Sequence, residues 1–387
     1  MDFGFSDEQE LMRQEAQRFC RKELSREYVR WMDENANFIP DELWNKMAGL
    51  GHFGVNVPHE YGGMGLGMVD AMVILEELST ASAAVALCVG ASVGFGAKML
   101  TALGTKKQKE EFLPRLAKGE LKFALGLTEP GGGTDILGAI QTKAVDKGDH
   151  WLINGRKMFI SCAHVADYII TIAITAPEAK RHKGLSIFMV PRPSEGLETK
   201  LIHKLGCHAC GTNEVYYDDV KVPKENLLGN LNNGWNELLL TLNPERIATA
   251  MMSLGVAKAA FNDAMNYAKE RNAFGGPISR FQILQHYMAD IAIEIEAARN
   301  LIYKCAWLAD SGKPMHLEAT MAKVLAARAS EKAATWGMEI LGGYGYTMEY
   351  DMQRYFRDYK QMVFSPISDE MAKNMIMQFM GLPKSWS

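Results

Sequence analysis

The feature that most constrains the fold of this chain is a change of hydrophobic pattern in its middle third. Three runs rich in β-branched and aromatic residues, at 168–175, 185–190 and 215–217, have the length and composition of β-strands. Turn-forming residues lie between runs of this kind at 147–149 and 154–155. The pattern predicts a compact antiparallel β domain of about a hundred residues.

Helical patterns flank this segment on both sides. Ser6 and Gln9 match a capping box that opens a first helix, and a further apolar helix is expected at about 69–77. Apolar residues recur at steps of three and four over 281–298, and a last long helix is expected over 317–341. Both ends of the chain are therefore predicted to be helical.

The order of helices, sheet and helices predicts an α+β fold class. We expect an N-terminal helical domain at 1–120, a middle antiparallel β domain at 121–231 and a C-terminal helical bundle at 232–387. The chain contains neither a glycine-rich dinucleotide fingerprint nor a P-loop, so a Rossmann or P-loop nucleotide site is not supported.

Charge and hydropathy exclude other classes of partner. A net charge of −4 with no basic stripe argues against nucleic acid. Because the sequence has no uninterrupted run of eighteen apolar residues, no membrane insertion is expected. The first residues resemble neither a signal nor a transit peptide, which predicts a cytoplasmic protein.

The six cysteines do not resemble a disulfide framework. Cys207 and Cys210 form a CxxC string, but one such string supplies only two thiolates and no second pair lies at zinc-finger spacing. We therefore expect no metal site.

Six short strings are more specific than these general patterns. They are PHEYGGMG at 58–65, TEPGGGTD at 128–135, NGRKMFIS at 154–161, RNAFGGPI at 271–278, LGGYGY at 341–346 and RYFRD at 354–358. In this order, and across essentially the whole chain, they resemble the motifs of the acyl-CoA dehydrogenase family. The resemblance implies an FAD-dependent oxidoreductase that acts on acyl-CoA thioesters.

The family's FAD-binding positions imply a set of cofactor residues in this chain. They are Leu127, Thr128, Gly133, Thr134, Phe159, Ser161, Arg271, Phe274, Gln282, Glu339, Gly343, Ser368 and Glu370. An arginine fork suits a phosphate, and glycines allow the backbone to approach a ligand closely. Two positions depart from the family: Ala273 and Glu339 stand where relatives commonly have glutamine, and Glu339 brings a negative charge near an anionic ligand.

The catalytic base is predicted from the same resemblance. In most relatives it is a late glutamate, and that position is Pro366 here. A minority, the isovaleryl- and long-chain-type enzymes, place it just before a substrate-binding arginine, which corresponds to Glu245 and Arg246. A carboxylate in a dry pocket gains basicity through desolvation. The alternative is that Glu245, after Pro244, is a first-turn residue that complements a helix dipole.

The resemblance also implies substrate contacts at Thr134, Asn243, Arg246, Ser365 and Pro366. In relatives the backbone N–H at the late position polarises the thioester carbonyl, and proline has none. Either the Ile367 N–H or the Ser365 hydroxyl takes its place, or the chemistry is not ordinary α,β-dehydrogenation.

The implied reaction is α,β-dehydrogenation of an acyl-CoA or the reverse reduction of an enoyl-CoA, with hydride passing between Cβ and flavin N5. The C-terminal string from Ser365 to Met371 resembles the crotonobetainyl-CoA reductase branch, so both directions stay open. The implied partners are an acyl-CoA and an electron-transferring flavoprotein or similar carrier, in a homotetramer. Alternatives are a same-fold flavoenzyme with non-standard elimination on a cyclic or unusual acyl-CoA, and a non-catalytic scaffold.

Overall fold

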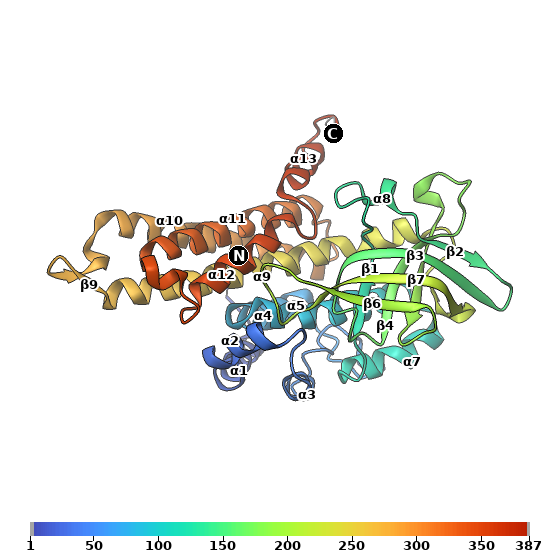
Figure 1. Ribbon diagram of the computed structural model, residues 1–387, viewed down its shortest axis with the longest axis horizontal. Coiled ribbons are helices and arrows are strands. Elements are labelled where there is room, and N and C mark those ends of the chain that lie inside the picture. The colour runs from blue at the N-terminus through green and yellow to red at the C-terminus, as the bar shows by residue number, and fades with distance from the viewer. Residues whose placement is uncertain (1–3, 385–387) are drawn as a thin grey trace.

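The computed structural model describes residues 4–384. Its N-terminal part is helical, as predicted, and Ser6 and Gln9 form the expected capping box. The helices are α1 (Asp7–Glu23), α2 (Arg26–Asn35), α3 (Asp41–Gly49), α4 (Met68–Ala81), α5 (Ala83–Gly90), the π-helical η2 (Ala91–Ala97), α6 (Lys98–Leu103) and α7 (Lys106–Ala117). In Figure 1 α1–α3 lie below the long C-terminal helices, and α7 lies under the sheet.

The middle part is one sheet with the strand order β6-β7-β3-β2-β4-β5-β8, and β1 pairs with β4. The strands are β1 (Phe123–Gly126), β2 (Lys143–Asp146), β3 (His150–Ser161), β4 (Tyr168–Ile174), β5 (Leu185–Pro191), β6 (Leu197–Ile202), β7 (Thr212–Pro223) and β8 (Leu227–Leu228), with the short helix α8 (Ile136–Ala139) after β1. The prediction of a purely antiparallel domain is wrong at β4, where both β1 and β2 pair in parallel.

The predicted turn at 154–155 is also wrong, because both residues lie inside β3. Gly155 instead marks a shift in the register between β3 and β7. Its φ of +151° lies in a region that favours glycine, and a Cβ there would lie 2.4 Å from Thr142 Oγ1. The glycine that suggested a turn is thus required by a bulge and a close contact.

The C-terminal part is a bundle in which α11 packs against α9, α10, α12 and α13. Its elements are α9 (Gly234–Glu270), the hairpin β9 (Asn272–Ala273) and β10 (Gly276–Pro277), α10 (Gln282–Asp310), α11 (His316–Leu341), the 3-10 turn η6 (Gly342–Tyr346), α12 (Met352–Phe364) and α13 (Asp369–Phe379). In Figure 1 α9–α12 run side by side away from the sheet, and α13 projects from the body.

One apolar segment bears on the expectation that the chain does not insert into a membrane. Ala83–Leu103 is long and apolar enough to cross a bilayer, with a mean hydropathy of 1.7, because serines and glycines interrupt the run without making it polar. Two thirds of its apolar window (67%) is buried against the rest of the chain. We therefore assign it to the protein core.

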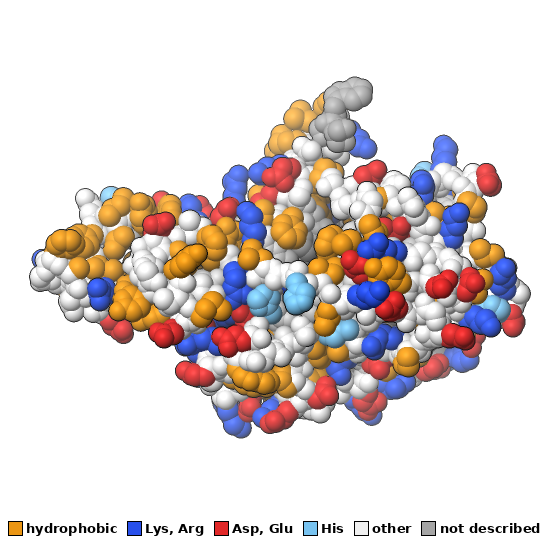
Figure 2. Space-filling model, viewed as in Figure 1, with side chains coloured by type: hydrophobic (Ala, Val, Ile, Leu, Met, Phe, Trp, Pro, Cys, Tyr) orange, Lys and Arg blue, Asp and Glu red, His pale blue; other side chains and the backbone are white. Residues whose placement is uncertain are grey.

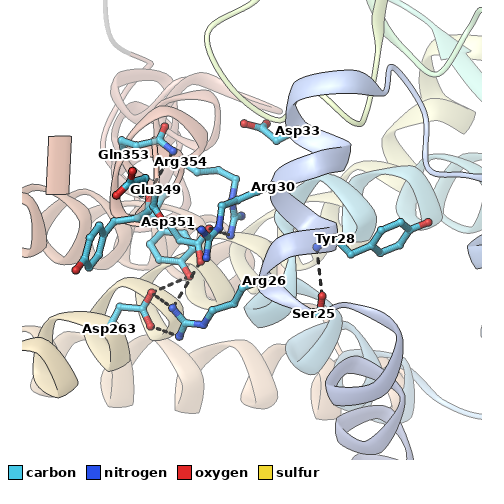
Figure 3. Close-up of polar contacts among 12 residues, drawn as sticks. Ser25, Arg26, Tyr28, Arg30, Asp33, Asp263, Glu349, Asp351, Gln353 and Arg354 are labelled. Carbon is cyan, nitrogen blue, oxygen red and sulfur yellow. Dashed lines mark hydrogen bonds and ion pairs between the residues drawn. The ribbon is translucent and has the colours of Figure 1, made fainter. Parts of the chain in front are cut away.

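Charged residues, of which Asp351 and Arg354 are buried, join the N-terminal helices to the C-terminal bundle (Figure 3). Arg26 of α2 donates to Asp263 of α9 at 2.9 Å. Arg30, one turn further along α2, lies 3.3 Å from Asp351, and Arg354 of α12 lies 3.4 Å from the same oxygen. The Asp351 side chain is fully buried (0% exposed), so these arginines supply the opposite charge that a buried carboxylate requires.

Candidate active site

The first part of the candidate site lies where β1 ends beside β3. The Met158 N–H donates to the Thr128 carbonyl at 2.8 Å, so the predicted residues at 127–128 and 159–161 are neighbours. Beneath them Lys157, fully buried, donates to Glu129 at 2.7 Å and to the Leu127 carbonyl at 3.1 Å. This ion pair fixes the two motifs against each other.

Glu129 is also held by the backbone. It accepts the Gln141 N–H at 2.7 Å and the Thr142 N–H at 3.0 Å. Burial by itself would raise the pKa of this carboxyl, but Lys157 and these donors outweigh burial and lower it. The residue therefore stays ionised and keeps the loop after β1 in place.

The surface above this pair is open and partly aromatic. Phe159 has a φ of 61° and its side chain is 59% exposed, which is rare for a bulky residue and places the ring in solvent. A Cβ on Gly133 would meet nothing within 4 Å. Thr134 is exposed, Ser161 is half-buried and Leu127 is buried. The exposed Phe159 ring and the open space at Gly133 leave room for a planar ligand.

A second part of the site is a cavity of about 510 Å³ at the far end of the bundle. Arg271 at the end of α9, Glu339 of α11 and the glycines of η6, Gly342 and Gly343, all line it. A Cβ on either glycine would meet nothing within 4 Å. The cavity thus joins three predicted cofactor residues, and its arginine and exposed backbone suit the phosphates and adenosine of FAD.

Glu339 gives this cavity an unfavourable charge for a phosphate ligand. We expect Glu339→Gln to tighten FAD binding about two- to fivefold, the size of a single exposed charge effect. Reconstitution of flavin-free protein with FAD measures the Kd. Glu331→Gln makes the same charge change at an exposed position of α11 outside the cavity lining and should leave the Kd unchanged. Equal or weaker binding by Glu339→Gln would show that the charge is harmless.

The third part of the site is the interior of α9. Glu245 lies well inside this helix, which begins at Gly234, so the alternative of a first-turn residue is wrong. Burial raises the pKa of the Glu245 carboxyl to about 7, and Arg246 opposes this only in part. A carboxyl that is half ionised near neutral pH is suited to proton transfer.

Arg246 is held beside this carboxyl by neutral partners. Its Nη1 donates to Asn243 Oδ1 at 2.7 Å, and Nη2 contacts Met375 Sδ at 3.8 Å. Asn243 in turn contacts His316 Nδ1. The Arg246 Nε is buried without a hydrogen-bond partner in the part of the chain that the structure describes. The guanidinium therefore has a free donor for a ligand.

The turn between α12 and α13 carries the remaining predicted residues. Lys323 of α11 donates to the Val363 carbonyl at 2.7 Å and to Asp369 at 2.6 Å, so it ties both ends of the turn to the bundle. Ser368 is the N-cap of α13, and its hydroxyl accepts the Met371 N–H at 3.3 Å. Ser365 and Pro366 are half-buried in this turn, and Glu370 is exposed just after it.

Two predicted residues stand apart from these groups. Phe274, between β9 and β10, is 95% exposed, and Gln282 at the start of α10 is exposed too. Phe281, Ile283 and Ile293 are also exposed, and hydrophobic side chains gather at this end of the molecule in Figure 2. Within residues 4–384, neither Phe274 nor Gln282 lines the cavity at Arg271.

The sequence motifs predicted no role for two buried lysines. Lys157 lies in the string at 154–161, which gave it no function, and Lys323 lies outside all six strings. A signal existed for Lys157, since it sits at an inward-facing position of a strand where a charge requires a partner. For Lys323 the only signal is a lysine inside an apolar helical stretch.

The helix–sheet–helix fold, the aromatic face beside β3 and the arginine–glycine cavity together define a flavin-dependent oxidoreductase. Family models match the N-terminal (6–120), middle (124–220) and C-terminal (232–381) domains of acyl-CoA dehydrogenases. The chain therefore belongs to the acyl-CoA dehydrogenase family, as the sequence motifs predicted, and FAD is its cofactor.

Individual relatives agree with this assignment. The chain is 39% identical to glutaryl-CoA dehydrogenase of Desulfococcus multivorans, with 92% of each chain covered. It is 38% identical to the caffeyl-CoA reductase-Etf complex subunit CarC of Acetobacterium woodii, over 92% of this chain and 93% of the relative. The butyryl-CoA dehydrogenase structure from Megasphaera elsdenii superposes with a TM-score of 0.94 at 35% identity and covers 98% of this chain and 100% of its own.

Proposed function

We propose that this enzyme exchanges hydrogen across the Cα–Cβ bond of an acyl-CoA thioester with Glu245 as the general base. The observation that carries the proposal is the Glu245 carboxyl, which lies inside α9 with a pKa raised by burial to about 7. The late position, where most relatives have their glutamate, is Pro366 and has no carboxylate. Glu245 is therefore assigned as the only general base of the reaction.

In the oxidative direction Glu245 removes the α-proton and holds it on its carboxyl. Bound FAD supplies the acceptor for the hydride that leaves Cβ. Arg246, pinned by Asn243, positions the acyl-CoA through its free Nε, while α13 covers this face through Met375. A dry setting favours the reaction, because it raises the basicity of the carboxylate.

The thioester carbonyl needs a hydrogen-bond donor that Pro366 cannot give. We assign this role to the same turn, through the Ser365 hydroxyl or the Ile367 N–H. Lys323 supports it by holding the turn at Val363 and Asp369. A donor placed by a rigid turn costs little reorganisation during the reaction.

The substrate class and the direction of the reaction are proposed from the names of the relatives. Their names include dehydrogenases and reductases of CoA thioesters, and one is a subunit of a reductase-Etf complex. We propose an electron-transferring flavoprotein or similar carrier as redox partner, in the cytoplasm. The exposed apolar residues around Phe274 favour a homotetramer in which a second subunit completes the flavin site.

The raised pKa predicts a pH dependence. Only ionised Glu245 can take the α-proton, so the rate of flavin reduction by an acyl-CoA should fall about tenfold per pH unit below pH 7 and level off above it. Anaerobic stopped-flow measurement of flavin bleaching at low substrate reports the pKa of the free enzyme. A rate that does not change between about pH 5.5 and 8 would remove Glu245 from this role.

A further inference from the structure

Three cysteines from distant parts of the sequence meet outside the flavin site. Cys88 lies on α5, Cys162 directly follows β3, and Cys210 precedes β7. Their sulfurs all lie within 4.8 Å of one another, and the Cys162 and Cys210 sulfurs are 3.5 Å apart. All three side chains are almost completely buried. We propose that Cys88, Cys162 and Cys210 form a structural site for a thiophilic divalent cation, zinc.

The fold explains why these residues meet. The β3–β7 ladder continues past its last strand pair, because the Cys162 N–H donates to the Gly211 carbonyl at 2.8 Å. Cys210 therefore lies beside Cys162, and Cys88 reaches the same loop by donating to the Ala209 carbonyl at 3.3 Å. Cys207 turns elsewhere, where its N–H donates to Asp358 at 2.6 Å. Of the CxxC string, only Cys210 therefore belongs to the cluster. Cys88 and Cys162 supply the other two thiols.

The spacing fits zinc. Sulfurs about 2.3 Å from a tetrahedral ion lie about 3.8 Å apart. The Cys162–Cys210 separation of 3.5 Å is close to this value, and the longest possible separation in the cluster, 4.8 Å, closes with small side-chain shifts. Soft thiolates also favour zinc over the oxygen-seeking magnesium and calcium.

The surroundings can carry the charge of such a site. Lys204 donates to the Cys210 carbonyl at 2.6 Å. Three thiolates around a divalent ion leave one net negative charge, which Lys204 offsets.

His164 offers a fourth ligand. Its Nε2 is buried without a hydrogen-bond partner among residues 4–384, and its Nδ1 contacts Asn213 at 3.2 Å. With His164 as the fourth ligand, the site would have three cysteines and one histidine, a ligand set of structural zinc sites. Bound zinc would link α5 to the end of β3, next to Ser161.

The test is the metal content of the FAD-loaded enzyme, purified from zinc-supplemented cells and passed through a chelating column. We expect about one zinc per chain by mass spectrometry, with sulfur neighbours at about 2.3 Å in X-ray absorption. Cys210→Ala should lower the zinc content at least tenfold. Cys207→Ala changes a buried cysteine of the same loop outside the cluster and should keep the metal.

Flavin content and the melting temperature show whether each variant folds. If Cys210→Ala does not fold, Cys88→Ala on α5 replaces it with the same expected loss. Wild-type enzyme with no zinc and six free thiols would overturn the proposal, as would a Cys162–Cys210 disulfide. Zinc retained by a folded Cys210→Ala variant would overturn it too.

Discussion

Glu245→Gln should abolish the bleaching of bound flavin by an acyl-CoA while FAD stays bound. The amide keeps the shape of the side chain but cannot accept the α-proton at neutral pH. A positioned general base contributes about 10²- to 10⁴-fold, so we expect a loss of that size in the rate of flavin reduction. Anaerobic stopped-flow absorbance with a saturated acyl-CoA measures it.

The matched control is Glu331→Gln, the same change at an exposed position of α11 outside the cavity lining. It should leave the rate within about twofold of the wild type, since exposed charges far from a site have small effects. Flavin content must be equal in both variants. Near-normal bleaching by Glu245→Gln would assign the base to another residue.

Lys157→Met should lower the free energy of unfolding more than any of the other substitutions proposed for this enzyme. The substitution preserves the length of the side chain but leaves Glu129 buried beside only backbone donors. Removal of one partner of a buried ion pair costs about 3–5 kcal/mol, because the remaining charge is uncompensated. Urea unfolding at saturating FAD measures the change in free energy, and FAD affinity should fall because the pair orders the loop at Thr128.

Lys200→Met provides the comparison in the same sheet. Lys200 lies 3.4 Å from Glu198, and the side chains of both residues are more than half exposed. Such surface pairs contribute about 0–1 kcal/mol, so the same substitution should change stability little. Equal losses in the two variants would mean that burial of the Lys157 pair is not what stabilises the sheet.

The sequence predicted the architecture well because its hydrophobic period changes clearly. The helix expected over 317–341 is α11 (His316–Leu341), and the run at 168–175 is β4 (Tyr168–Ile174). The parallel pairing of β1 with β4 could not be predicted, since the partner of a strand depends on tertiary packing. The turn predicted at 154–155 was wrong for a related reason, because glycine occurs both in turns and in β-bulges.

The sequence predicts individual site residues that belong to a motif. It predicts less well the contacts between residues that are distant in the chain. Glu245 was predicted from its place before Arg246, but its raised pKa emerges only from the packing around α9. The partners of Lys157 and Lys323 are distant in sequence. Arg354, quoted as a motif residue, belongs to the buried charges between domains, a role that local sequence does not reveal.

The central claim is that this flavoprotein exchanges hydrogen with CoA thioesters, and anaerobic titration of the purified enzyme tests it most directly. We expect a yellow protein whose flavin absorbance is bleached by at least one saturated acyl-CoA from a panel of short, branched and cyclic thioesters. The reduced enzyme should regain its colour with the matching enoyl-CoA. A protein that cannot bind FAD, or a bound flavin that no thioester bleaches or reoxidises, would contradict the account.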